Sequence, residues 1–120
     1  MNKNKQIGDT KKWSKLVDFI SLKFGDGKTL DLQAILFLIG VHELGQGYRE
    51  FSKEEKLNLL HIAICKLLSR YGYYKYVGKD EDGWPHWKTN TNLPKLKTGE
   101  ETALIKEASI DYFMDSGIEF

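Results

Sequence analysis

Hydrophobic residues recur at three- and four-residue intervals near the start of the chain. The repeat contains Trp13, Leu16, Val17, Ile20 and Phe24. This spacing places the five side chains on one face of a helix, and the Gly-Asp-Gly turn at residues 25–27 ends it. Residues 1–11 are polar and lysine-rich, so we expect a loose basic arm before the helix.

A second helix is predicted from about Leu30 to Leu44. Its middle, residues 34–41, is apolar on every side, which is typical of a helix surrounded by others. A buried strand is a poorer interpretation, because the pattern is too long and lacks flanking turn residues. The run is far shorter than the ~20 residues needed to span a bilayer, so no membrane association is expected.

Two later helices are predicted from capping signals. Ser52 and Glu55 have capping-box spacing before an apolar repeat that ends at Gly72, and Thr98 and Glu101 repeat that spacing before a helix ending near Gly117. These patterns predict a mainly α fold, a compact bundle of about four helices forming a single domain over residues 12–120.

The segment between the last two helices is different. Residues 73–77 are aromatic and branched, residues 78–83 form a turn-like polar stretch, and residues 84–88 are again aromatic. Either a short β-hairpin or an ordered aromatic-rich loop fits this pattern. Any strand containing Pro85 must be an edge strand, because proline cannot donate a ladder hydrogen bond.

The composition is that of an ordinary globular protein. The 120 residues contain 18 Lys and Arg against 17 Asp and Glu, a net charge of +1, which argues against a general binder of nucleic acid. The single cysteine, Cys65, permits no internal disulfide, and the N-terminus has no apolar stretch of the kind a secretory signal requires. We therefore expect a cytoplasmic protein.

Several residues invite a catalytic or metal-binding interpretation. His42-Glu43 begins the zinc pattern H-E-x-x-H, but residue 46 is Gln, and residues 80–83 lack the remaining ligands of a calcium loop. His61 and Cys65 are neighbours on one helical face and could in principle share a metal ion, but the rest of that face is apolar, which favours a packed cysteine beside a hydrogen-bonded histidine. No intact catalytic, phosphate-binding or metal motif occurs, so we expect no cofactor. The alternative is a small-ligand-binding protein or metal-dependent enzyme in which His42, Glu43, His61 and His86 converge on a pocket.

The aromatic segment is the leading candidate for a binding surface. Tyr and Trp combine a large apolar area with a polar tip, which suits recognition and also suits anchoring a loop to helices. The candidate binding residues are Tyr73, Tyr74, Tyr76, Trp84, His86 and Trp87. We predict a protein-interaction or self-associating module that uses residues 71–88. The consecutive acids at 80–82 offset the nearby lysines, so nucleic acid is not the expected partner.

The stretch from His61 through Cys65, Tyr73-Tyr74 and residues 78–86 resembles a group of small uncharacterised bacterial proteins. The resemblance covers roughly residues 30–115. It implies a compact bacterial domain and assigns no functional residue.

Charge is segregated along the chain. Residues 1–15 contain five lysines and one aspartate, whereas residues 100–120 contain six acids and one lysine. These segments are expected to attract one another, within a chain or between copies, and such an attraction weakens with added salt.

Overall fold

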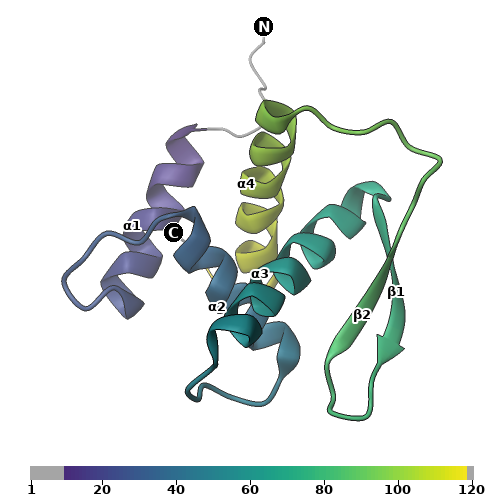
Figure 1. Ribbon diagram of the computed structural model, residues 1–120. Helices are drawn as coiled ribbons and strands as arrows, with labels where there is room; N and C mark the ends of the chain where they lie inside the picture. The colour runs from purple at the N-terminus through teal and green to yellow at the C-terminus, as the bar shows by residue number, and fades with distance from the viewer. Residues whose placement is uncertain (1–9, 119–120) are drawn as a thin grey trace, which may run out of the picture. The chain divides into compact units, whose positions relative to one another are not determined.

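The computed structural model describes residues 10–118, which form four α-helices and one two-stranded hairpin (Figure 1). In chain order these are α1 (Thr10–Phe24), α2 (Leu32–Leu44), α3 (Lys53–Leu68), the 3-10 helix η1 (Ser69–Tyr71), β1 (Tyr74–Lys79), β2 (Pro85–Thr89) and α4 (Thr98–Asp115). The four predicted helices are confirmed, and the segment between the last two is a hairpin. Most of the predicted basic arm, residues 1–9, lies outside the described residues. Its last two positions, 10 and 11, already belong to α1.

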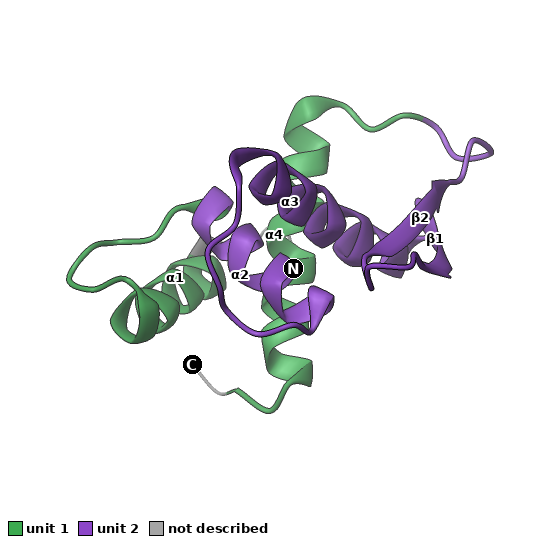
Figure 2. Ribbon diagram, turned by 60° about the horizontal axis from the view of Figure 1, so that its bottom comes forward, with its two compact units in different colours: residues 1–32, 95–120 green, residues 33–94 purple. Residues whose placement is uncertain are grey.

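The chain divides into two compact units, residues 1–32 with 95–120 and residues 33–94 (Figure 2). In the first unit α1 packs against α4. Leu16 and Ile20 of α1 are buried, as are Ile105 and Ala108 of α4. Hydrophobic burial along two facing stripes therefore holds this pair together.

The second unit is built on α2 and α3. Ile35 and Ile39 of α2 are fully buried, as is Leu59 of α3. Gly40 lies directly against the Leu59 backbone, where an added Cβ would come within 2.8 Å of the carbonyl carbon. The two helices cross this closely because residue 40 has no side chain. The apolar run of α2 is less uniformly enclosed than predicted: one face is buried, and Phe37 on another is only half-buried.

The predicted cap of α3 is confirmed. The Glu55 backbone N–H donates to the Ser52 hydroxyl at 3.1 Å, and the Glu55 carboxylate accepts from the Ser52 N–H at 2.9 Å. The cap of α4 was predicted one residue too late. There the Lys97 N–H donates to the Glu100 carboxylate at 3.2 Å, and Thr98 is the first helical residue. Because lysine cannot accept a hydrogen bond, only half of a capping box operates at this helix.

None of the helices within residues 10–118 combines the length and the apolar character needed to cross a bilayer.

Candidate functional site

The hairpin begins where α3 ends. After η1, Gly72 adopts a left-handed conformation with φ of 86°, which reverses the chain. The Tyr73 N–H then donates to the Leu68 carbonyl at 3.2 Å. Asn90 ties the far end of β2 to the same turn, because its side-chain amide donates to the Gly72 carbonyl at 2.9 Å and its backbone N–H donates to Tyr73. Both strands are thus fixed at the base of the hairpin.

The two strands are antiparallel, and their register sorts side chains onto two faces. The cross-strand pairs are Tyr74–Thr89, Lys75–Lys88, Tyr76–Trp87, Gly78–His86 and Lys79–Pro85. Because side chains alternate along a strand, Lys75, Lys88 and His86 share one face, opposite the face of Tyr76 and Trp87. A bulge between Tyr76 and Gly78 leaves Val77 outside the pairing.

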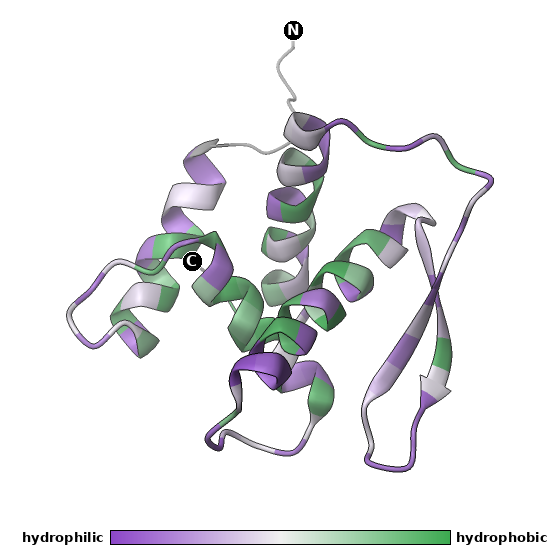
Figure 3. Cartoon of the chain, viewed as in Figure 1, coloured by the Kyte–Doolittle hydropathy of each residue, from purple (hydrophilic) through white to green (hydrophobic). Residues whose placement is uncertain are grey.

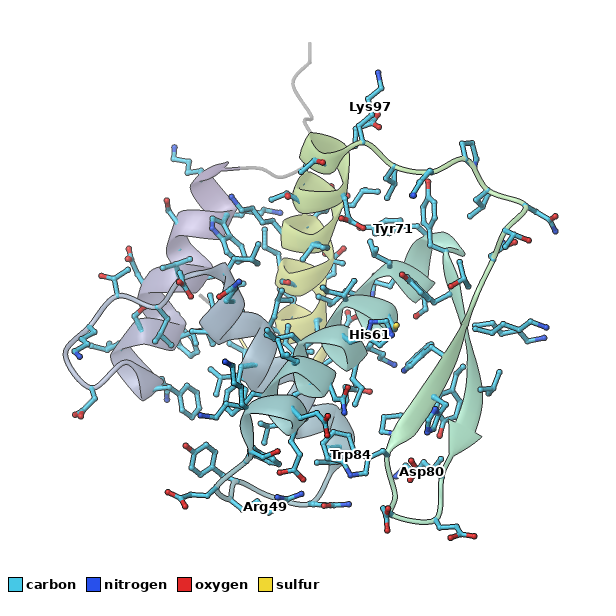
Figure 4. All side chains as sticks on the ribbon, in the orientation of Figure 1. Arg49, His61, Tyr71, Asp80, Trp84 and Lys97 are labelled. Atoms are coloured by element: carbon cyan, nitrogen blue, oxygen red, sulfur yellow. The ribbon has the colours of Figure 1, made fainter. Side chains whose placement is uncertain are left out.

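The inner face of the hairpin packs against α3. The Tyr74 and His61 rings meet edge to face at 6.4 Å, and Pro85 at the start of β2 is buried. Tyr76 and Trp87 form an edge-to-face pair with ring centroids 5.2 Å apart. In Figure 4, His61 lies on the side of α3 that is turned toward the hairpin. The prediction that a strand containing Pro85 is an edge strand is confirmed, since β2 belongs to a sheet of two strands.

Trp84 anchors the tip of the hairpin to the helices. It packs against a buried cluster of Leu44, Phe51 and Leu59, and Figure 4 shows it between the hairpin and the helical part of the unit. Gln46 adds a hydrogen bond from its side-chain amide to the Asp82 carbonyl at 2.8 Å. Trp84, one of the candidate binding residues, therefore packs mainly against the core.

Asp80 organises the turn between the strands. Its Oδ1 accepts hydrogen bonds from the backbone N–H groups of Asp82 at 2.9 Å and Trp84 at 3.0 Å, and its Oδ2 lies 2.9 Å from Nε2 of His86. The bond to His86 and then the bond from Trp84 lower the pKa of the Asp80 carboxyl below its ordinary value of 3.8. The acidic residue that resembled part of a calcium loop thus acts as a turn-forming acceptor.

The remaining side chains on the outside of the hairpin face solvent. We define the hairpin surface as the exposed residues Lys75, Val77, Glu81, Asp82, His86 and Lys88, together with Tyr76, which is exposed although it belongs to the inner face. Val77 is 58% exposed and Tyr76 is 48% exposed. Figure 3 shows the hairpin as mostly hydrophilic, with one hydrophobic stretch on β1. Of the six candidate binding residues, Tyr76 and His86 lie on this surface.

A second aromatic group, absent from the predicted sites, joins α2 to the loop before α3. Phe37, Tyr48 and Phe51 form a triangle of edge-to-face contacts, with centroid distances of 6.0–6.5 Å. The Arg49 guanidinium lies 4.4 Å from the Phe51 ring centroid and 3.2 Å from Glu55, and the Arg49 hydrogen bond is the main cause of the lowered pKa of Glu55. In the sequence, the only indication of this group is that Tyr48 and Phe51 lie on either side of Arg49.

The residues proposed for an alternative pocket have separate partners. His42 lies 3.7 Å from the adjacent Glu43, whereas His61 contacts Tyr74 and His86 contacts Asp80. Across residues 10–118, no three His, Cys, Asp or Glu side chains are grouped in a way that could hold a metal ion.

Cys65 is fully buried, and its Sγ lies 3.4 Å from Nε2 of His61. Burial raises the pKa of the Cys65 thiol to about 12. The thiol is therefore protonated at neutral pH, and the predicted packing of a cysteine beside a hydrogen-bonding histidine is confirmed.

No family model matches the chain, and neither the curated proteins nor the solved structures include one that matches it.

Proposed function

We propose that the protein is a protein-interaction or self-associating module whose contact surface is the hairpin surface. The observation that carries this proposal is the contrast between the two sides of the hairpin. The inner side is held against α3 by the contact of Tyr74 with His61, and Pro85 is buried, while other side chains, among them the apolar Val77 and its charged neighbours, are exposed. Tyr76, next to Val77 in the chain, is also exposed, and an aromatic and an aliphatic side chain among charged groups form a composition that suits a recognition surface.

The attachment of the hairpin supports the same function. Trp84, Gln46 and Asn90 hold it at the tip and at the base. A surface that is already ordered loses little conformational entropy when a partner binds. A two-stranded hairpin in isolation is only marginally stable, so these contacts keep the surface in one conformation. The buried, reduced Cys65 supports action in the cytoplasm.

The proposal is tested with two substitutions that make the same chemical change. Val77→Asp places a charge in the hairpin surface, and Leu57→Asp places one on α3, where the side chain is 62% exposed. We expect Val77→Asp to weaken association at least tenfold and Leu57→Asp to leave it unchanged. Sedimentation velocity measures self-association, and capture on the tagged chain followed by mass spectrometry measures other partners. The proposal fails if both variants retain every association of the unchanged chain.

A further inference from the structure

The hairpin surface has two pairs of charges without a counter-charge in the described part of the chain. Lys75 and Lys88 are exposed, and neither makes an ion pair or side-chain hydrogen bond within residues 10–118. The Glu81 and Asp82 carboxylates at the tip are equally unpaired there. By contrast, the neighbouring Asp80 is occupied by His86 and two backbone N–H groups.

The lysine pair is unfavourable for the isolated chain. Lys75 and Lys88 lie directly opposite one another in the register, and like charges in that relation destabilise a sheet. The acidic tip is too distant to compensate. Residues 75 and 80 are five apart along an extended strand, roughly 16 Å, which exceeds the ~8–10 Å screening length at physiological salt. A contact with an external anion relieves this repulsion.

The same hairpin offers two groups of the opposite charge at its tip. We propose that the lysine pair of one copy receives the acidic tip, Glu81 and Asp82, of a second copy, so that two hairpins lie antiparallel with their outer faces together. A two-fold axis makes this contact reciprocal, because each tip then meets the other copy's lysine pair. This inference rests on the proposed function and names its partner as a second copy of this chain.

The contact is expected through the faces of the hairpins, not through their strand edges. The bulge at Val77 and the lysine within β1 are features that oppose pairing along an edge. The outer face, with Lys75, Lys88 and His86, remains available because the opposite face packs on α3.

The association is expected to be weak. A face two strands wide and roughly 16 Å long covers about 160 Å² per copy, well below the ~800 Å² of a standard interface. Exposed ion pairs each contribute little, so we expect a dissociation constant of about 0.1–1 mM at low salt. Such a dimer forms at high local concentration and separates readily.

A charge-exchange experiment tests the arrangement. One variant reverses the lysine pair (Lys75→Glu with Lys88→Glu), and the other reverses the tip (Glu81→Lys with Asp82→Lys). In each variant by itself, positions 75 and 88 have the same charge as the tip positions 81 and 82. Its dimer is therefore expected to be more than tenfold weaker by sedimentation equilibrium. An equimolar mixture of the two variants restores opposite charges at both contacts. We expect the mixture to associate as the unchanged chain does.

Matched controls reverse charges elsewhere in the same unit, with Lys53→Glu plus Lys56→Glu and Glu50→Lys plus Glu54→Lys. These are expected to leave association unchanged, and circular dichroism checks that every variant is folded.

The inference is overturned if the mixture stays monomeric, or if the unchanged chain is monomeric near 1 mM at low salt. If the unchanged chain is monomeric but Val77→Asp still removes a captured partner, the proposed function stands and only the second copy is excluded. A monomeric chain is also tested for binding of polyglutamate or of oligonucleotide. If either binds and reversal of the lysine pair abolishes that binding, the lysine pair receives another anion and the second copy is excluded.

Discussion

Asp80 shows how much one side chain determines at this site. Its carboxylate accepts bonds from Asp82, Trp84 and His86, and so joins the turn to the first residues of the returning chain. The sequence placed this residue correctly in a polar turn. It did not reveal the acceptor role of Asp80. Three consecutive acids are chemically similar, and only the geometry of the folded turn decides which carboxylate accepts the backbone hydrogen bonds.

The Asp80 bonds predict a pH dependence at the tip. Since the pKa of Asp80 is lower in the folded chain than its ordinary value of 3.8, its stabilising contribution is fully present above that value. The contribution is lost as the pH falls through the lowered pKa. In an NMR titration into acid, we expect the Asp82 and Trp84 amide resonances to shift together with a midpoint below 3.8. Asp80→Asn removes that transition, and a midpoint above 3.8 in the unchanged chain would contradict the assignment.

The sequence alone does not predict whether Trp84 is exposed for binding or packed against the core. Tyr and Trp suit both a binding surface and an anchor, and the sequence does not distinguish these uses. The structure places Trp84 against Leu44, Phe51 and Leu59, whereas Tyr76 in the same hairpin remains 48% exposed. The difference depends on tertiary packing, which periodicity along the chain does not specify.

At the scale of elements, the helices were predictable because local signals agreed. Apolar spacing gave α1 and α3, and the Ser52–Glu55 pair gave the start of α3 correctly. The start of α4 was shifted because Thr98 has the right chemistry but lies one residue inside the helix. The choice between hairpin and loop required the register, which depends on pairs such as Tyr76–Trp87 that are distant in sequence.

The crossing of α2 and α3 gives a second prediction. A methyl group on residue 40 would meet the backbone of Leu59, which cannot move aside as a flexible side chain could. We expect Gly40→Ala to lower the free energy of unfolding by about 1–3 kcal/mol, despite the better helix propensity of alanine. Chemical denaturation measures this change.

Gly99→Ala is the matched control, because the same substitution in α4 meets no heavy atom within 4 Å. It should leave stability unchanged or raise it slightly, through helix propensity. A Gly40→Ala variant as stable as the unchanged chain would refute the close crossing.

At the scale of the whole molecule, a net charge of +1 conceals a local asymmetry. In the first unit the lysine-rich α1 packs against the acidic α4, and the Lys106 ammonium lies 5.5 Å from the Trp13 ring centroid. In the second unit the hairpin keeps Lys75, Lys88 and its acidic tip apart. Overall composition therefore gave no indication of the charged surface on which the proposed function depends.

The most direct test of self-association through the hairpin surface is the dimer dissociation constant of the unchanged chain, measured by sedimentation equilibrium across a salt series. Raising ionic strength from ~0.01 M to ~1 M shortens the screening length from about 30 Å to about 3 Å. Association through the hairpin charges is therefore predicted at low salt, with the dissociation constant rising at least tenfold over the series. A dissociation constant that does not change with salt, or a chain that stays monomeric at the lowest salt, would contradict it.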